Sequence, residues 1–299
     1  MHQDQLHIDS DIARRMIREQ FPQYLHEDVV AVAGAGTDNA IFRIGSESAA
    51  RFPLRAMNPV ECAARLRSEA AAMSELWQLC PFPTPRPVGL GAPGPDYPMP
   101  WTVQTWIEGE AATPAGLSRS RTFALDLVRL ITSLRQGDVR GRRFNGRGRG
   151  GNLVDHDAWM EVCLSNSESL LDVAQLRRMW ARFRELPPAG PEVMSHKDLI
   201  PANLLVASEH LIGVLDGGGF GPADPSLDLV VAWHLLDRER RMIFRDAIQA
   251  NDVEWRRGGA WAFQQAMGLV WYYQITNPTM SALGRSTISR LVEDYADRH

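Results

Sequence analysis

Long apolar runs are missing from this 299-residue sequence, and cysteine and lysine are scarce. No stretch approaches the roughly eighteen consecutive apolar residues of a membrane-spanning helix, so we expect no membrane partner. The three cysteines, Cys62, Cys80 and Cys163, lie far apart and match no metal-binding spacing. We therefore expect reduced, partly buried thiols rather than disulfides. After Met1 the chain opens on polar residues, His2, Gln3 and Asp4, unlike a secretory signal, which predicts a soluble, cytoplasmic protein.

Charge and lysine content narrow the class of protein further. A formal net charge of −4 at pH 7 argues against nucleic acid as the principal partner. Lys197 is the only lysine, so 31 of the 32 basic residues are arginines (32 minus one), which we attribute to genomic base composition. With 44% hydrophobic residues, the chain can bury a substantial core and fill two lobes.

The most informative motif is H-x-D-x-x-x-x-N at residues 196–203, followed by Asp216 after an apolar stretch. A carboxylate, an amide and a second carboxylate at this spacing are what a phosphoryl-transfer site needs. In such a site Asp198 accepts or orients the proton of the acceptor hydroxyl, while Asn203 and Asp216 hold Mg²⁺. The apolar runs between Asn203 and Asp216 predict a short hairpin that brings both residues to one end. The alternative is a surface loop in which the acidic residues have no function. It does not explain why so many positions match the motif in the right order.

These residues resemble the aminoglycoside phosphotransferase family of small-molecule kinases (APH-like), which are relatives of protein kinases. The segment at 221–229, G-P-A-D-P-S-L-D-L, is similar to the family's G-x-x-D-P-x-x-D-L segment, and the resemblance runs from about residue 30 to about residue 278. Two positions depart from the family pattern: Lys197 stands where glycine is usual, and Gly217 where an aromatic residue is usual. Neither departure removes a metal ligand or the base.

The order of predicted elements agrees with this resemblance. We expect helices at 9–24 and 59–79, and strands at 29–32, 40–44, 49–52, 88–90 and 101–106. A linker is predicted at 107–111, and then helices at 119–135, 155–165, 172–185, 226–236, 239–250, 253–276 and 284–296. The fold class expected is α+β, a two-lobed protein-kinase-like fold. Residues 1–106 would form a small mixed nucleotide-binding lobe and residues 107–299 a larger, mainly helical catalytic and acceptor-binding lobe.

The resemblance also implies a reaction. The γ-phosphate of ATP or GTP passes to a hydroxyl group of a small-molecule acceptor, and an antibiotic such as an aminoglycoside or a macrolide is the acceptor that the family implies. Asp198 is then the catalytic residue, and Asn203 and Asp216 are the Mg²⁺ ligands. Two alternatives stay open: a metabolite kinase for a sugar or an amino alcohol, and a catalytically silent nucleotide-binding protein. The intact Asp198, Asn203 and Asp216 argue against the silent protein.

Further residues are assigned to the nucleotide. Gly34 and Gly36 lie between the first two predicted strands, where glycines let backbone N–H groups turn toward phosphate oxygens. The resemblance suggests Thr37 and Asn39 as polar contacts in the same loop.

The phosphate-binding cation of the small lobe cannot be a lysine in this sequence. Arg51, on the third predicted strand, takes that role by resemblance, because a guanidinium can bind two phosphate oxygens at once. Its expected partner is Glu69 on the following helix. Gln104 and Trp106, at the end of the last strand before the linker, complete the predicted nucleotide site.

Other residues have more than one interpretation. His196 is expected to pack and hydrogen-bond the loop, and Asp228 either caps a helix or braces the catalytic loop. Several acidic and aromatic residues could contact the acceptor, but we favour a solvated surface for the acids and a packed core for the aromatic rings. These residues are Glu108, Glu110, Asp237, Glu239, Asp252, Glu254, Trp233, Trp271, Tyr272 and Tyr273. The stretch at 140–151, with five arginines and five glycines, could bind nucleic acid. A flexible surface loop is the interpretation that we favour for it.

Overall fold

The computed structural model describes residues 6–32 and 38–295, and the chain divides into two compact units. The first unit comprises Met1–Gln78, Pro83–Glu108 and Asp216–Gly219, and the second comprises Leu79–Phe82, Gly109–Leu215 and Phe220–His299. Asp216 therefore belongs to the first unit, although the residue before it, Leu215, belongs to the second. Among the described helices, none is both long enough and apolar enough to cross a membrane.

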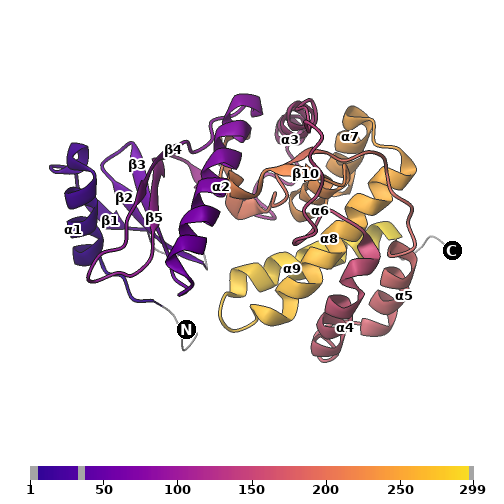
Figure 1. Ribbon diagram of the computed structural model, residues 1–299. Coiled ribbons are helices and arrows are strands. Elements are labelled where there is room, and N and C mark those ends of the chain that lie inside the picture. Colours follow the sequence, from indigo (N-terminus) through magenta and orange to yellow (C-terminus); the bar gives the residue numbers. More distant parts are fainter. Residues whose placement is uncertain (1–5, 33–37, 296–299) are drawn as a thin grey trace. The chain divides into compact units, whose positions relative to one another are not determined.

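An antiparallel sheet forms the centre of the first unit (Figure 1). Within the described residues it has five strands in the order β1-β2-β3-β5-β4. The strands are β1 (Val29–Ala31), β2 (Asn39–Ile44), β3 (Ser48–Pro53), β4 (Pro87–Gly91) and β5 (Trp101–Thr105). Each of them overlaps a strand that apolar runs and turn residues predict, because these signals are local in the sequence.

Two helices accompany the sheet, and in Figure 1 the strands lie between them. Helix α1 (Ser10–Gln20) begins where Asp9 accepts hydrogen bonds from the backbone N–H groups of Asp11 and Ile12 and so caps the helix. Helix α2 (Pro59–Leu79) matches its predicted range. Apolar residues of both helices join the sheet in one core, in which the rings of Phe52 and Trp101 stack with centroids 4.6 Å apart.

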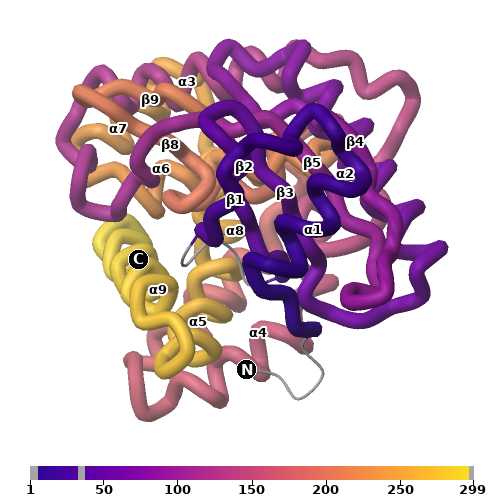
Figure 2. Tube along the Cα trace, turned by 90° about the vertical axis from the view of Figure 1, so that its left-hand side faces the viewer, coloured from indigo at the N-terminus to yellow at the C-terminus, as the bar shows by residue number. Residues whose placement is uncertain are grey.

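The second unit is mainly helical. Its helices are α3 (Arg121–Arg135), α4 (Asp157–Asn166), α5 (Val173–Phe183), α6 (Val230–Leu235), α7 (Arg238–Ile248), α8 (Asp252–Tyr272) and α9 (Pro278–Tyr295). Helices α8 and α9 pack along each other (Figure 2), and α8 is buried over most of its length. The predicted start of the last helix at residue 284 is wrong by six residues (284 minus 278), because a proline favours the first turn of a helix.

Short strands complete the second unit. The predicted hairpin is present as β8 (Leu204–Ala207) and β9 (His210–Val214), and β6 (Glu110–Ala111) adds to it, so the end of the predicted linker is in fact a strand. A separate pair, β7 (Val193–Ser195) and β10 (Gly221–Ala223), was not predicted. Three-residue strands carry too short a pattern to be recognised without their partner.

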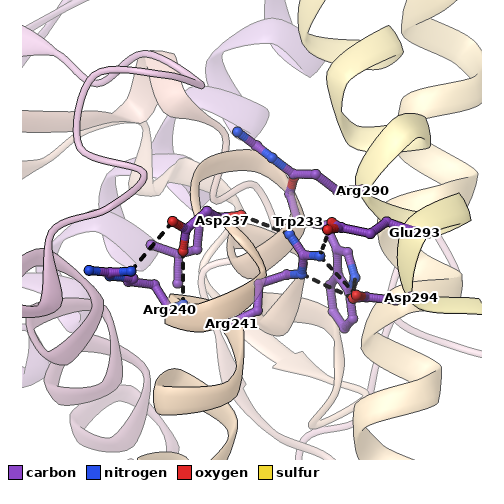
Figure 3. A network of polar contacts seen from close by, with 8 residues as sticks. Trp233, Asp237, Arg240, Arg241, Arg290, Glu293 and Asp294 are labelled. Carbon is purple, nitrogen blue, oxygen red and sulfur yellow. Dashed lines mark hydrogen bonds and ion pairs between the residues drawn. The ribbon is translucent and has the colours of Figure 1, made fainter.

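A buried ionic network joins α7 to α9 in the second unit (Figure 3). The Arg241 side chain is 1% exposed and donates to Asp294 from Nε at 3.0 Å and from Nη2 at 2.8 Å. It also donates to Glu293 at 2.8 Å, and Trp233 Nε1 donates to Asp294 at 2.9 Å. Because a buried charge is costly without a partner, these contacts link α7 to α9 through the Arg241 side chain.

Candidate functional site

The predicted catalytic loop lies between β7 and β8 and is held from its backbone. The N–H groups of His196 and Lys197 donate to the two carboxylate oxygens of Asp228, at 2.8 and 3.0 Å. The imidazole of His196 is fully buried, and its Nε2 lies 2.9 Å from the carbonyl oxygen of Leu215. Asp228 therefore braces the loop and makes no side-chain cap on α6. His196 packs and hydrogen-bonds the loop, as the sequence predicts.

Lys197 occupies the loop position where the family pattern has glycine. Its φ of 72° lies in the left-handed region, which glycine adopts at no steric cost and a lysine adopts only with strain. The ammonium group lies 5.9 Å from the centroid of the Phe144 ring, within range of a cation–π interaction. Burial lowers the pKa of Lys197.

Asp198 and Asn203 are connected directly in the second unit. The amide nitrogen of Asn203 donates to the backbone oxygen of Asp198 at 2.9 Å and to its carboxylate at 3.1 Å. Asn203 is 8% exposed, whereas the Asp198 side chain is 39% exposed. The loop thus presents an oriented carboxylate to solvent, and the amide nitrogen of Asn203 donates a hydrogen bond to it.

Two further residues contact Asp198, and sequence reasoning missed both. Arg149 Nη2 lies 2.9 Å from Oδ1 of Asp198, and Gln265 Nε2 donates to the same oxygen at 3.3 Å. Arg149 belongs to the stretch that we interpreted as a flexible surface loop. Gln265 is 7% exposed within the apolar helix α8. A polar residue in a buried helical stretch is uncommon, and this signal could have drawn attention to it.

A chain of buried hydrogen bonds continues from Gln265. Its Oε1 lies 3.1 Å from Nε2 of His234, and Nδ1 of His234 lies 2.8 Å from the Thr287 hydroxyl. Burial lowers the pKa of His234 to about 4, so the imidazole is neutral at physiological pH. If Gln265 donates to Asp198, its oxygen must accept from Nε2 of His234, and the Thr287 hydroxyl then donates to Nδ1. The chain fixes the orientation of the Gln265 amide.

In the first unit, Arg51 on β3 pairs with Asp216. The distance from Nη2 to Oδ1 is 3.1 Å, and the side chains are 16% and 48% exposed. The expected partner of Arg51 was Glu69, but Glu69 instead lies 3.5 Å from Arg65, one helical turn away on α2. Burial raises the pKa of Glu69, and the positive charges of Arg65 and Arg51 partly oppose this. The predicted Arg51–Glu69 pair was therefore wrong, because Asp216 and Arg65 supply nearer partners.

The turn after Asp216 explains the second departure from the family pattern. A Cβ atom added to Gly217 would lie 2.3 Å from Cδ2 of Leu76, and one added to Gly218 would lie 3.2 Å from Cβ of Glu69. Both glycines thus pack closely against α2. A larger residue at 217, such as an aromatic one, would need the Leu76 side chain to move.

A cavity of about 160 Å³ lies between α2 and the sheet of the first unit. Arg51, Glu69 and Gln104 line it together with apolar residues of α2, β4 and β5. Three residues assigned to the nucleotide thus share one cavity. Asn39 begins β2 opposite Pro53 and does not line it.

Trp106 belongs to a different cluster of the first unit. Its Nε1 donates to Glu108 at 3.0 Å, and the guanidinium of Arg43 lies 5.4 Å from the centroid of its ring. Arg43 in turn pairs with Glu108 at 2.9 Å. The other predicted phosphate-loop residues, Gly34, Gly36 and Thr37, lie outside the described residues.

All three cysteines are free, as predicted. Cys62 and Cys163 are buried and Cys80 is half-buried. Burial raises the pKa of Cys80 and of Cys163 to about 11, so both are thiols at neutral pH.

Comparison with solved structures identifies the fold. The GDP and kanamycin complex of APH(2")-IIia has a TM-score of 0.70 and 18% sequence identity, with 96% of this chain and 99% of that chain covered. The GDP complex of wild-type aminoglycoside 2'-phosphotransferase-IIIa has a TM-score of 0.72 and 16% identity, over 96% of this chain and all (100%) of that one. The macrolide 2'-phosphotransferase MphH from Brachybacterium faecium has a TM-score of 0.62 and 15% identity, over 93% and 97%.

Comparison of sequences gives the family. No curated protein matches the chain. The model of the phosphotransferase enzyme family, APH, matches residues 29–261, which is most of the chain and includes the loop at Asp198 and the turn at Asp216. With its N-terminal antiparallel sheet and mainly helical remainder, the chain belongs to the APH phosphotransferase family and has the α+β kinase-like fold of that family.

Proposed function

We propose that this phosphotransferase moves the γ-phosphate of a nucleoside triphosphate, ATP or GTP, to a hydroxyl group of a small molecule. The observation that carries the proposal is the loop at Asp198. Asp228 braces the loop backbone, and Asn203 and Gln265 donate to the Asp198 carboxylate, which is still 39% exposed. A fixed and reachable carboxylate is what orientation of an acceptor hydroxyl requires.

Asp198 is the catalytic residue of the proposed reaction. The acceptor oxygen forms a bond to the γ-phosphorus while the bond from that phosphorus to the bridging oxygen of the β-phosphate breaks. The hydroxyl proton passes to the Asp198 carboxylate, and the nucleoside diphosphate leaves. Because the transition state is loose, orientation and charge neutralisation contribute more than proton transfer does.

Asn203 and Asp216 are proposed to hold Mg²⁺, and the available donor atoms fit that metal. The amide nitrogen of Asn203 is committed to Asp198, so its amide oxygen is the atom left for a cation. Asp216 is half exposed and uses Oδ1 for Arg51. Amide and carboxylate oxygens are hard donors of the kind that Mg²⁺ prefers. When bound, Mg²⁺ would neutralise charge on the nucleotide phosphates.

The remaining assignments concern the nucleotide. Arg51 is proposed to clamp a phosphate, because its pair with Asp216 leaves further guanidinium donors. Glu69 and Gln104 line the same cavity as Arg51. The other residues that we assign to the nucleotide on the family pattern alone are Gly34, Gly36, Thr37, Asn39 and Trp106.

The class of acceptor is supported less directly. Structures of relatives contain kanamycin, gentamicin or streptomycin, which favours an antibiotic acceptor, but those proteins are only 14–18% identical to this chain. The ion pair between Arg149 and Asp198 favours the second candidate, a metabolite kinase, because it places a cation where an aminoglycoside would bring its own positive charges.

The test combines binding with turnover. Thermal unfolding is measured with ATP and GTP, with and without Mg²⁺, and phosphate transfer is then measured over a panel of hydroxyl compounds. We expect a Mg²⁺-dependent stabilisation by nucleotide. Asp198→Ala should lower kcat by about 10²–10⁴-fold for every acceptor and leave nucleotide–Mg²⁺ affinity within a few-fold of wild type.

Asp216→Asn is the companion variant. It conserves shape but weakens metal coordination, so we expect a folded protein without turnover. Retention of more than about a tenth of the wild-type kcat, a factor of about 1.4 kcal/mol, would show that Asp216 is not an essential ligand. A protein that binds nucleotide but transfers phosphate to no acceptor, including water, would be the silent alternative.

A further inference from the structure

We propose that the acceptor carries an acidic group, a carboxylate or a phosphate, close to the hydroxyl that is phosphorylated, and that Arg149 binds this group. The inference rests on the proposed function, because it takes Asp198 as the residue that receives the acceptor hydroxyl. It names the charge class of the acceptor, and it makes Arg149 a specificity-determining residue.

Arg149 is placed to bind an anion beside Asp198. Its Nη2 lies 2.9 Å from Oδ1 of Asp198, and its side chain is 27% exposed. Its Nε is buried and has no hydrogen-bond partner. A guanidinium has five N–H donors in a planar fork. Arg149 therefore has donors left for a second anion while it binds Asp198.

The backbone next to Arg149 is fixed to the second unit. Gly150 has a φ of 121°, and a Cβ added there would lie 2.8 Å from Cβ of Ala223 on β10. The N–H of Asp224 donates to the carbonyl oxygen of Gly150 at 2.8 Å, and Arg257 donates to that of Gly151 at 3.4 Å. This end of the glycine-rich stretch is therefore packed, which corrects our interpretation of it as a flexible loop. Arg149 is held next to Asp198 by the fold.

The groups near Asp198 include several positive charges. Lys197 precedes Asp198 in the loop. Burial lowers its pKa, the negative charges of Asp228 and Glu192 oppose this lowering, and the positive charge of Arg142 adds to it. Burial lowers the pKa of half-buried His156 and of buried His234, and the positive charge of Arg149 adds to both shifts. The field around the acceptor side of Asp198 is thus partly positive.

Most of the acidic residues that the sequence offered for a cationic acceptor pair with other groups of the chain. Asp237 caps α7 by accepting from the N–H of Arg240 at 2.9 Å, and Glu254 pairs with Arg135 at 2.7 Å. Further acidic residues that pair with arginines are Glu239, Asp252 and Glu108. The charged group that contacts Asp198 is the guanidinium of Arg149, which would repel a cationic acceptor.

An acidic acceptor would use this arrangement in a simple way. Its carboxylate or phosphate would bind the guanidinium donors of Arg149 that Asp198 does not use, and its hydroxyl would meet the exposed carboxylate of Asp198. A polycation such as kanamycin would instead bring ammonium groups toward Arg149, and like charges in contact oppose binding. A different role for Arg149, contact with the transferred phosphoryl group, predicts an equal loss of kcat for all acceptors.

The experiment uses two series of hydroxyl compounds matched in shape and differing in charge. One series is D-glucuronate, D-glucose and 6-amino-6-deoxy-D-glucose, and the other is D-glycerate, glycerol and 3-amino-1,2-propanediol; kanamycin is added as a polycation. Binding is measured by ligand-observed NMR and phosphate transfer by release of nucleoside diphosphate. The proteins are wild type, Arg149→Gln, and the control Arg147→Gln, an exposed arginine of the same stretch.

We expect the acid of at least one series to bind wild type at least about 10-fold more tightly than its neutral and cationic counterparts, as a charged hydrogen bond requires. Arg149→Gln should remove this preference, mostly through Kd or KM, and Arg147→Gln should keep it. The inference is overturned by any of four results: no preference for acids, a preference that survives Arg149→Gln, transfer to kanamycin as efficient as to acids, or an equal loss of kcat for all acceptors.

A binding measurement separates this inference from the proposed function. Mg²⁺-dependent binding of ATP or of GTP, measured by calorimetry without any acceptor on wild type and Asp216→Asn, tests the nucleotide site alone. Without such binding the proposed function fails. With such binding, but without a preference for acids that depends on Arg149, the inference about the acceptor fails and the phosphotransferase assignment stands.

Discussion

At the scale of single residues, Arg51 shows how the chain manages without a lysine on β3. Its guanidinium binds Asp216 at 3.1 Å, which places it beside a proposed metal ligand. Arg51→Ala should raise the KM for nucleotide and lower kcat, together by about 10–100-fold in kcat/KM, which is the worth of a charged hydrogen bond. Arg51→Lys should recover part of both, because it keeps the charge but loses the fork. Steady-state kinetics at varied ATP measure the effect, and unchanged kinetics would move the role to Arg43.

Gln265 gives a second prediction at this scale. It orients Asp198 and is itself oriented by His234, so Gln265→Leu should lower kcat about 10-fold while leaving the KM for nucleotide unchanged. Gln264→Leu is the matched control, because the Gln264 amide faces His156 instead. In the Asp198→Ala background the Gln265 substitution should cost nothing further if it acts through Asp198. Additive losses in that double variant would contradict a positioning role.

At the scale of elements, Arg241 links α7 to α9 through a buried ionic network. Arg241→Ala leaves Asp294 and Glu293 without their cation, and Asp294 is only 13% exposed. We expect a loss of about 3–5 kcal/mol in the free energy of unfolding, as for other broken buried ion pairs. Arg238→Ala, an exposed position on the same helix, should change it by no more than about 0.5 kcal/mol. Urea denaturation compares the two variants, and equal midpoints would show that the network contributes little.

At the scale of the whole molecule, His234 makes the stability of the fold depend on pH. Its pKa is lowered from 6.5 to about 4 by burial, so below pH 6.5 the unfolded chain takes up a proton that the folded chain does not. The free energy of unfolding therefore has its full value above pH 6.5. It falls by about 3 kcal/mol in total as the pH is lowered to about 4. His234→Asn should flatten the stability curve over this range, and exposed His26→Asn should not. Denaturation at several pH values tests this, and parallel curves for wild type and His234→Asn would refute it.

Most elements of the first unit could be predicted because their signals are local. The Asp9 cap, the apolar spacing of α2 and the short runs of the strands are properties of neighbouring residues. The three-residue pair β7 and β10 could not be predicted, since each strand exists through its partner. In the same way, the end of the linker became a strand only by pairing with β8.

The sequence by itself determined the family and the chemical groups of the candidate site. Asp198, Asn203 and Asp216 stand at a spacing that indicates phosphoryl transfer, and the single lysine excludes that residue type as the clamp on β3. Spacing along a chain carries this information because the loop and the turn are contiguous segments.

Only the tertiary structure decided which residues these groups contact. Arg149 and Gln265 reach Asp198 from 49 and 67 residues away in the sequence, and Arg51 reaches Asp216 across 165. Contacts of this kind arise when packed helices and strands bring distant segments together, and no local pattern encodes them. The physical reason is that side chains pair with the nearest group of opposite charge in space, which is why Arg51 binds Asp216 and Glu69 lies nearest Arg65.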